Sequence, residues 1–243
     1  MKTTPGDASE SKVKSQARTP AFSVAITAKA PLPGFAKTRL IPLLGAAGAA
    51  RAQRGFILRT LATMAAAGPR SITLWCAPDA DQRFFRALGR KRSAEPKPRL
   101  ARQCAGDIGQ RMAWAFAAHA DHAALAPRPA PPSHAEPLLL VGTDCPALTV
   151  HHIAEVVAAL ADGADATFVP VEDGGYVLVA LRDPGAGTFG IFSGIEWSTR
   201  RVMEQTRERL RAAGARWHET APLWDVDEPA DWLRWRASSQ IDR

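Results

Sequence analysis

The chain is poor in cysteine and tyrosine, and it has no long hydrophobic run. Its 243 residues include three cysteines and one tyrosine. Cys76, Cys104 and Cys145 form no C-x-x-C pair, which argues against a zinc site and suits a reducing compartment. No stretch approaches the ~18 consecutive apolar residues that a membrane span needs. We therefore expect a cytoplasmic protein without a membrane span, and we expect Cys145 to be a small buried residue.

Two common nucleotide-binding motifs are also missing. The sequence contains neither G-x-x-x-x-G-K-[ST] nor G-x-G-x-x-G, and it shows no internal repeat. Those motifs cradle phosphates with glycine-rich backbone at the start of a helix. A nucleotide site in this chain must therefore be built from other loops.

The formal charge of +7 raises the hypothesis of a nucleic-acid partner. Most of the arginines fall on the polar faces of predicted helices, where a solvated surface explains them. The strand platform of aromatic and basic residues that RNA-binding modules use is missing from the sequence. Trp224, Trp232 and Trp235 have helical or near-helical spacings that are typical of a core. We expect no nucleic-acid partner, and a non-catalytic nucleotide- or RNA-binding module is the alternative.

The length fits one α/β domain better than two. Residues 1–20 are polar with mixed charge and predict a disordered tail, which leaves a domain over residues 21–237. Proline-rich residues 126–137 predict a surface excursion. The predicted strands are 22–27, 71–76, 99–103, 138–141, 166–170 and 176–181, with a short one near Arg216. The predicted helices are 46–66, 79–88, 107–119, 150–160 and 198–213, with a last one from Pro229.

This alternation of strands and helices predicts a mostly parallel, doubly wound sheet. The strands 166–170 and 176–181 are candidates for a hairpin, which would add one antiparallel strand. In such sheets the ligand sites lie beyond the carboxyl ends of the strands. The loops that follow the predicted strands are therefore the first places to look for chemistry.

The loop after the first strand has the composition of a phosphate cradle. It contains Lys29, Gly34, Lys37 and Arg39, together with two prolines that hold the loop open. Glycine allows the backbone to approach a ligand, and the three cations can neutralise a diphosphate or triphosphate. The alternative is an ordinary basic surface loop.

A second glycine-containing turn follows the third strand and opens a helix. It contains Gly106, Asp107, Gly109 and Arg111. Backbone groups at such a helix start can line a base or ribose pocket, and Arg111 could reach a phosphate. The alternative is that Asp107 only caps the helix.

Two aspartates are candidate metal ligands. Asp144 follows the buried run 138–141, and Asp227 belongs to the acidic turn Asp225-Val226-Asp227. Two carboxylates from separate strand ends can hold one Mg²⁺ or Mn²⁺ ion against a diphosphate. The alternatives are an Asx-turn or helix cap at Asp144 and an N-cap at Asp227.

The third turn, Glu172-Asp173-Gly174-Gly175-Tyr176, follows the fifth strand. Its two acids could provide a general base for an acceptor hydroxyl, with Gly174, Gly175 and Tyr176 binding the acceptor. The expected catalytic residues are thus Asp144, Glu172 and Asp173. The alternative is a tight turn without a chemical role.

Taken together, these segments resemble a known family. The motifs A-K-A-P-x-P-G-x-A-K-T-R-L, G-D-I-G-x-R-M, G-T-D-C-P-x-L, E-D-G-G-Y, W-S-T and D-V-D-x-P occur in this order between about residues 21 and 235. They are similar to bacterial GT-A-type transferases that are associated with radical-SAM and selenodomain proteins and proposed to be arsenosugar glycosyltransferases. A more distant resemblance links them to molybdenum-cofactor and phospholactate guanylyltransferases.

The resemblance implies a nucleotide-diphospho-sugar transferase (GT-A) fold, a nucleotide or nucleotide-sugar donor, a small-molecule acceptor and Mg²⁺ or Mn²⁺. It matches Lys29, Lys37 and Arg39 to a phosphate loop, and Asp144 and Asp227 to metal ligands. The chain departs from the pattern at three places. It has no spaced D-x-D at Asp144 and no L-A-G-G opening, and Glu228 and Ala230 stand where the last motif has Thr and Glu.

Two reactions fit these parts. The missing L-A-G-G loop and the hydroxyl-suited turn at Asp173 favour transfer of a sugar from a nucleoside-diphosphate sugar to a small-molecule hydroxyl. The alternative is nucleotidyl transfer to a phosphorylated small molecule with release of pyrophosphate. The sequence leaves open the nucleotide, the acceptor and the oligomeric state.

Overall fold

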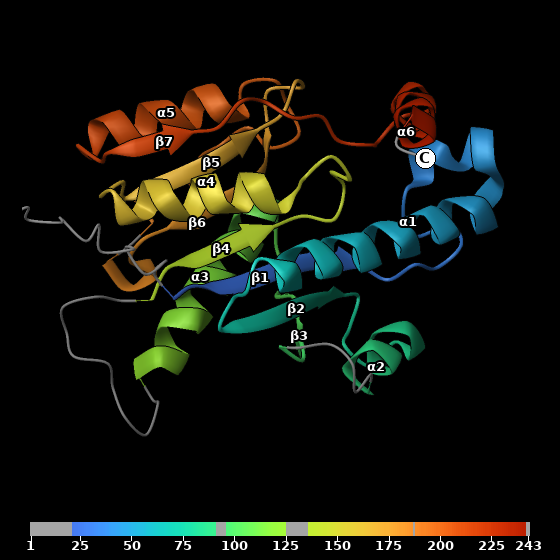
Figure 1. Cartoon of the computed structure of the whole chain (residues 1–243), viewed down its shortest axis with the longest axis horizontal. Helices are drawn as coiled ribbons and strands as arrows, with labels where there is room; N and C mark the ends of the chain where they lie inside the picture. The colour runs from blue at the N-terminus through green and yellow to red at the C-terminus, as the bar shows by residue number, and fades with distance from the viewer. Residues whose placement is uncertain (1–20, 91–95, 125–135, 187, 242–243) are drawn as a thin grey trace, which may run out of the picture.

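The structure is a computed structural model that describes residues 21–90, 96–124, 136–186 and 188–241 (Figure 1). The predicted tail, residues 1–20, and most of the excursion at 126–137 lie outside the described residues. The strands are β1 (Ser23–Lys29), β2 (Ser71–Ala77), β3 (Arg99–Arg102), β4 (Leu138–Val141), β5 (Ala166–Pro170), β6 (Tyr176–Leu181) and β7 (Trp217–Glu219). The α-helices are α1 (Ile41–Ala66), α2 (Arg83–Arg90), α3 (Ile108–Ala124), α4 (Val150–Ala161), α5 (Val202–Ala212) and α6 (Pro229–Ile241).

The described strands form one seven-stranded sheet in the order β3-β2-β1-β4-β6-β5-β7. Pairing is parallel from β3 through β4, and β6 runs antiparallel to both of its neighbours. The sheet is thus mostly parallel and doubly wound, with β5 and β6 joined as a hairpin, as the sequence predicts. The strand order reverses between β1 and β4, and this switch point is where open α/β sheets leave a crevice for ligands.

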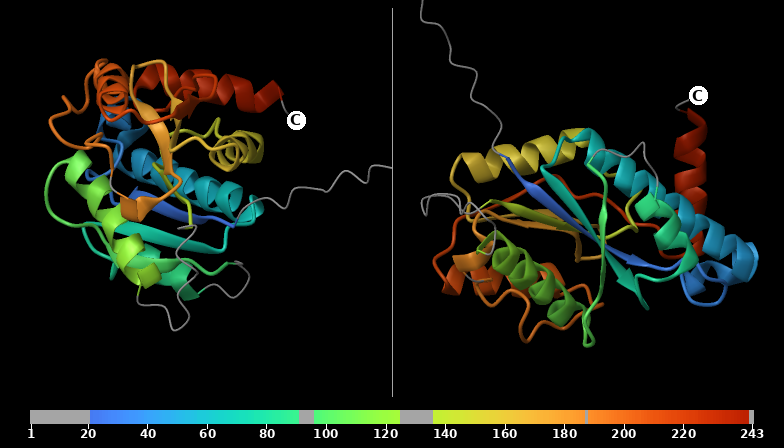
Figure 2. Two further views of the ribbon diagram at one scale, coloured as in Figure 1. Left: turned by 90° about the vertical axis from the view of Figure 1, so that its left-hand side faces the viewer. Right: turned by 90° about the horizontal axis from the view of Figure 1, so that it is seen from below.

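Helices cover both faces of the sheet (Figure 2). Helices α1, α2 and α4 contribute to one buried cluster, and α3 and α5 contribute to the other. Each strand contributes side chains to both clusters, because successive side chains of a strand point to opposite faces of the sheet. In β4, for example, Leu139 and Val141 join the first cluster, and Leu138 and Leu140 join the second.

A third cluster attaches the carboxyl-terminal helix to the start of the chain. Phe56 of α1 packs against Trp232 and Trp235 of α6, with ring centroids 6.2 Å and 5.2 Å apart. Leu40 and Val226, both fully buried, belong to the same cluster. The loop before α1 and the acidic turn before α6 are therefore held side by side. Trp224, Trp232 and Trp235, for which the spacing predicts a core position, are partly buried and pack against this cluster.

Three helices begin more than one residue away from the predicted start. Helix α1 starts at Ile41 and contains a kink at Gly45, where φ is 69°. Helix α2 starts only at Arg83, because the carboxylate of Asp79 accepts the backbone N–H of Asp81 in a preceding turn. Helix α5 starts at Val202 instead of residue 198. Within the described ranges, no helix combines the length and the apolar character required to cross a membrane.

Candidate active site

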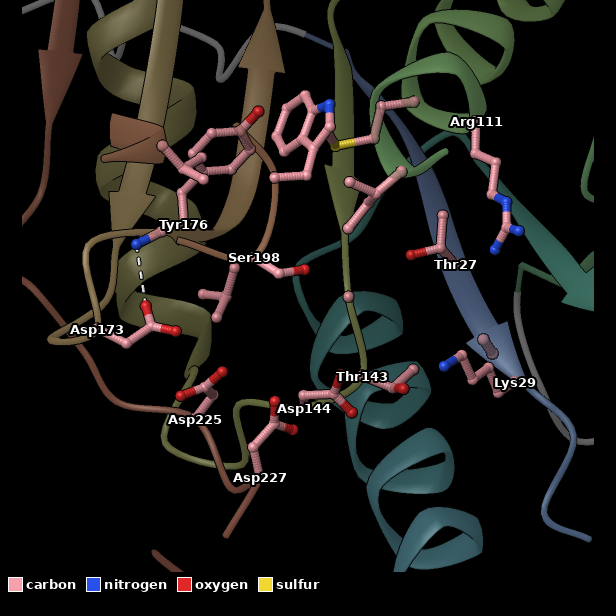
Figure 3. Close-up of a pocket in the computed structure, with 18 of the residues that line it drawn as sticks. Thr27, Lys29, Arg111, Thr143, Asp144, Asp173, Tyr176, Ser198, Asp225 and Asp227 are labelled. Atoms are coloured by element: carbon pink, nitrogen blue, oxygen red, sulfur yellow. Dashed lines mark hydrogen bonds between the residues drawn. The ribbon is translucent and has the colours of Figure 1, made fainter. Parts of the chain in front are cut away.

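A cavity of about 600 Å³ opens at the switch point of the sheet (Figure 3). Its walls come from the carboxyl ends of β1 and β4, the amino end of β6 and the first turns of α3. Four loop segments add to the lining: the loop at 35–39, the β5–β6 turn, residues 197–199 and the acidic turn with Asp225 and Asp227. Because β6 is antiparallel, its amino end meets the carboxyl ends of its neighbours at one edge of the sheet.

The structure divides the residues that the sequence predicts for the site into two groups. Those that line the cavity are Lys29, Lys37, Arg39, Arg111, Asp144, Asp173, Gly175, Tyr176 and Asp227. Those that do not line it are Gly34, Gly106, Asp107, Gly109, Glu172 and Gly174. The phosphate loop, the two candidate metal ligands and one of the two candidate bases therefore meet in one place.

Lys37 is not a free phosphate ligand. Its Nζ lies 2.6 Å from Oδ1 of Asp144 and 2.8 Å from Oδ1 of Asp227, and it donates a hydrogen bond to the carbonyl of Val226 at 2.8 Å. Burial lowers the pKa of Lys37, but the two carboxylates raise it and prevail, so the net shift is upward. The structure pairs Lys37 with these two carboxylates, and a contact between Lys37 and the donor phosphates stays a prediction.

The same two carboxylates are exposed enough to reach a divalent ion, although Oδ2 of Asp227 lies 4.0 Å from Nη1 of Arg39. Their side chains are 46% and 41% exposed, and each contacts Lys37 through one oxygen only. Asp173 and Asp225 line the same cavity, so carboxylates outnumber the single buried lysine. Among the described residues, no three His, Cys, Asp or Glu side chains lie close enough to hold a metal by themselves. Mg²⁺ in nucleotide sites takes one or two carboxylates and fills its shell with phosphate oxygens and water, and the donor set here fits that mode.

Asp225 is a cavity residue to which the sequence motifs assign no role. Burial, reinforced by the charges of Asp227 and Asp173, raises the pKa of Asp225 to about 7. A signal for it exists in the sequence, because alternate residues of an extended segment point the same way. With Val226 fully buried between them, Asp225 and Asp227 both face the cavity.

The cations that lack a carboxylate partner lie on the opposite side. Figure 3 shows Arg111 and Lys29 across the cavity from Asp173 and Asp225. In the described part of the chain, Nε of Arg111 is buried without a hydrogen-bond partner, and no ion pair involves Lys29. A buried N–H donor without a partner is costly unless an acceptor such as a phosphate oxygen completes it. This side of the cavity is therefore suited to phosphate.

The glycine-containing turn before α3 shapes the site without lining it. Oδ1 of Asp107 accepts the N–H of Gln110 at 2.8 Å, and the Gln110 side chain accepts the N–H of Asp107 at 2.9 Å. This is a helix cap, the alternative role for Asp107. A Cβ on Gly109 would lie 2.6 Å from Nε1 of Trp197, and Gly106 has a φ of 115°. The expectation that Gly106, Asp107 and Gly109 touch the nucleotide is corrected: they orient the first turn of α3.

Gly34 and Gly174 also have conformational roles instead of binding roles. Gly34 has a φ of 78°, a left-handed conformation that favours glycine, and it lies outside the cavity lining. Gly174 has a φ of 90°, and a Cβ there would lie 2.2 Å from the carbonyl oxygen of Arg200. Its own carbonyl accepts the N–H of Met203 at 2.9 Å. Gly174 therefore anchors the β5–β6 turn to the start of α5, and it is not placed to bind an acceptor.

Glu172 points out of the site. Arg234 of α6 binds its carboxylate through two hydrogen bonds of 2.7 Å and 3.0 Å. These hydrogen bonds, and the charge of Arg234, lower the pKa of Glu172. The guanidinium group also lies 4.4 Å from the ring centroid of Trp224. The expectation of a general base at Glu172 is wrong, because its carboxylate is engaged on the outer surface.

Tyr176 contributes its ring, and not its hydroxyl group, to the wall of the cavity. The ring packs edge-on against Phe168 and Trp197, with centroids 5.3 Å and 6.5 Å away. Its hydroxyl is buried without a hydrogen-bond partner among the described residues, and Figure 3 shows it directed away from Asp173. Burial raises the pKa of Tyr176. Tyr176 and Trp197 thus form an aromatic wall of the cavity.

Two cavity residues have left-handed backbone conformations. In the described ranges, the non-glycine residues with positive φ are Lys37 (50°), Phe189 (53°) and Ser198 (63°). Lys37 and Ser198 line the cavity. Such conformations are strained and tend to occur at functional sites. The left-handed backbone of Ser198 also prevents α5 from starting there.

Cys145, next to Asp144, is buried as predicted. Its Sγ donates a hydrogen bond to the carbonyl of Trp224 at 3.2 Å. Burial raises the pKa of Cys145 to about 11, so its thiol stays protonated at neutral pH. It is a packing residue and not a nucleophile.

Comparison with known proteins identifies relatives of the chain. Residues 60–199 match the model of a family described as "Uncharacterized protein conserved in bacteria (DUF2064)". No curated protein matches the chain. The structure is similar to that of the "putative nucleotide-diphospho-sugar transferase" of Desulfovibrio desulfuricans G20, with a TM-score of 0.74 and 27% identity over 90% of this chain and 88% of that chain.

Two further structures are similar in fold alone. One is 4-diphosphocytidyl-2C-methyl-D-erythritol synthase from Anaerococcus prevotii DSM 20548, with a TM-score of 0.55 and 12% identity over 91% of this chain and 99% of that one. The other is CMP:2-keto-3-deoxy-manno-octonic acid synthetase complexed with CTP, with a TM-score of 0.51 and 14% identity over 92% of this chain and 100% of that one. The chain thus has the GT-A-like α/β fold of nucleotide-dependent transferases, as its motifs predict.

Proposed function

The chain belongs to the DUF2064 family of bacterial proteins, and we propose that it is a glycosyltransferase that moves a sugar from a nucleoside-diphosphate sugar to the hydroxyl of a small molecule. The observation that carries this proposal is the division of one cavity into two chemically different sides. Unpaired cations lie on one side and carboxylates on the other. The 27% identity to a protein named as a nucleotide-diphospho-sugar transferase supports the donor class.

The donor diphosphate would bind on the side of β1 and α3. Arg111 and Lys29 can form charge-assisted hydrogen bonds with phosphate oxygens, and these contacts strengthen as the nucleoside diphosphate departs with its negative charge. Asp144 and Asp227 would hold a Mg²⁺ or Mn²⁺ ion. When bound, such an ion acts as a Lewis acid that neutralises charge on the leaving diphosphate.

The acceptor would bind on the side of β6. Asp173 lines the cavity there, and the N–H of Gly175 donates to its Oδ1 at 2.9 Å, which fixes the carboxylate. Its second oxygen can take the proton from an acceptor hydroxyl as the bond to the sugar forms. The rings of Tyr176 and Trp197 supply a wall against which the acceptor can pack.

The adjacent residues Glu172 and Asp173 allow a matched test of the proposed general base. Asp173→Asn should lower the rate of nucleoside-diphosphate release on the order of 10²-fold or more, because the general base is lost, while donor affinity stays nearly constant. Glu172→Gln should leave the rate close to that of the wild type, since Glu172 faces Arg234 outside the cavity. The rate is measured with a panel of nucleotide sugars and a small-molecule bacterial extract as the source of acceptor.

Full activity of Asp173→Asn, or an equal loss in both variants, would contradict this assignment.

A role beside radical-SAM and selenodomain proteins in arsenosugar formation remains a prediction from the motif resemblance. The divalent ion and the cytoplasmic location are likewise predictions. Release of pyrophosphate from a nucleoside triphosphate would support the alternative, nucleotidyl transfer.

A further inference from the structure

Lys37 places a positive charge between the two carboxylates that a divalent ion would use. We propose that this ammonium group is a resident cation that competes with the metal, so that the metal affinity of the free protein is set by the displacement of Lys37. The inference rests on the proposed binding of a divalent ion at Asp144 and Asp227. It assigns to Lys37 a positioning role in place of the phosphate-binding role that the sequence predicts.

The contacts of the Lys37 ammonium group support this proposal. Its Nζ has three acceptors, Oδ1 of Asp144 at 2.6 Å, Oδ1 of Asp227 at 2.8 Å and the carbonyl oxygen of Val226 at 2.8 Å. An ammonium group has three donors, so all of its hydrogen bonds are made within the protein. No donor is left for a substrate phosphate.

Lys37 is also fixed in this position. Its side chain is only 5% exposed, and Nζ lies 5.6 Å from the centroid of the Phe56 ring. Its left-handed backbone, with φ of 50°, directs the side chain at the start of a short 3-10 helix, Thr38–Leu40. Arg39 differs in each respect, since its side chain is 66% exposed and its Nη1 lies 4.0 Å from Oδ2 of Asp227.

Two consequences follow from a fixed internal cation. Lys37 keeps Asp144 and Asp227 together without a metal, because it screens the repulsion between two carboxylates that share one partner. A divalent ion must approach against the charge of the ammonium group, or displace it. Binding to the free protein is then weak, and the ion is retained mainly when donor phosphates supply further ligands.

Binding of Mn²⁺ alone to the nucleotide-free protein tests the inference. By calorimetry, Lys37→Met should bind Mn²⁺ at least tenfold more tightly than the wild type, because a side chain of similar length remains and only its charge is lost. Arg39→Met removes a nearby cation that does not bridge the carboxylates, and it should change the affinity by less than about threefold. Adding Asp144→Asn to Lys37→Met should abolish the gain.

Thermal unfolding gives a second readout if Lys37→Met is less stable. In EDTA its Tm should fall below that of the wild type, because two carboxylates then face each other without a cation. Saturating Mn²⁺ should raise the Tm of the variant by more degrees than that of the wild type. A variant that gains neither Mn²⁺ affinity nor a larger Mn²⁺-dependent rise in Tm would overturn the inference.

The outcomes also separate this inference from the proposed transfer reaction. If Asp173→Asn and Glu172→Gln behave as expected but Lys37→Met gains no Mn²⁺ affinity, the transferase proposal stands and the resident-cation role is refuted. If Lys37→Met gains affinity at Asp144 but no nucleotide sugar is turned over, the resident-cation role stands without the proposed reaction.

Discussion

The cations that line the cavity differ in whether a carboxylate already neutralises them. Lys37 is bound to Asp144 and Asp227, and Arg39 lies at the edge of the same acidic group. Arg111 and Lys29 face the cavity from the other side. A cation already bound to two carboxylates gains little from a further hydrogen bond to a phosphate. A cation without a carboxylate partner gains the most from that charge-assisted hydrogen bond. The contacts of each cation, and not its residue type, therefore determine which cations can bind the phosphates of a nucleotide-sugar donor.

Arg111 provides the residue-scale prediction. Arg111→Gln should weaken the binding of nucleoside diphosphates on the order of tenfold or more, because a charge-assisted hydrogen bond contributes roughly 1.5 to 3 kcal/mol. The affinity for the corresponding nucleoside should change little. Arg102→Gln, at an exposed position on β3 outside the cavity, serves as the control. Calorimetry that shows equal losses for nucleoside and diphosphate would indicate a structural role for Arg111.

At the scale of helices and strands, much of the fold follows from local pattern. Each predicted strand and helix is present, because buried β-branched and leucine-rich runs and turn residues alternate clearly along the chain. The main differences lie at helix ends: α3 extends to Ala124, five residues beyond the predicted end, and α1 and α5 start at other residues than predicted. Ser198, with φ of 63°, delays α5, and Gly45 allows α1 to begin before its kink.

The site is less predictable than the fold, because its contacts join distant segments. The sequence correctly brought Lys37, Asp144 and Asp227 to one cavity, but it could not show that Lys37 bridges Asp144 and a second carboxylate 190 residues away. It also could not show that Arg234 holds Glu172 on the surface. Such pairings depend on how α6 packs onto α1, and local sequence patterns do not predict this packing.

Helix packing yields a prediction with an internal control. A Cβ on Gly109 would lie 2.5 Å from the carbonyl oxygen of Phe192, so Gly109→Ala should force α3 away from the 192–197 loop. We expect a loss of roughly 1 to 3 kcal/mol in the free energy of unfolding. Gly55 is exposed within α1, and a Cβ there would meet no atom within 4 Å. Gly55→Ala should instead stabilise by about 0.5 to 1 kcal/mol through helix propensity.

Denaturant unfolding of the two alanine variants checks this account of the glycines. Donor affinity should also fall in Gly109→Ala, because α3 carries Arg111 into the cavity. Gly55→Ala should bind the donor as the wild type does. A Gly109→Ala protein that is as stable as Gly55→Ala would show that the loop yields, and that Gly109 does not position α3.

At the scale of the whole molecule, the sheet brings two different surfaces together. Beyond the carboxyl ends of the parallel strands lie Lys29 at the end of β1, Arg111 at the start of α3, which follows β3, and Asp144 in the loop after β4. The antiparallel strand β6 presents its amino end, with Asp173 and the aromatic wall, at the same edge. The third cluster, through α6 and α1, holds the acidic turn against this edge. In the proposed reaction the donor binds over one half of the sheet and the acceptor over the other.

The identity of the phosphorus-containing product tests this account most directly. The protein would be incubated with Mn²⁺, a small-molecule bacterial extract and either nucleotide sugars or nucleoside triphosphates, and the products followed by phosphorus-31 NMR. We expect release of a nucleoside diphosphate from a nucleotide sugar, with the release lost in Arg111→Gln at low donor concentration and in Asp173→Asn at all concentrations. Pyrophosphate released from a nucleoside triphosphate, with no nucleoside diphosphate formed from any nucleotide sugar, would contradict it.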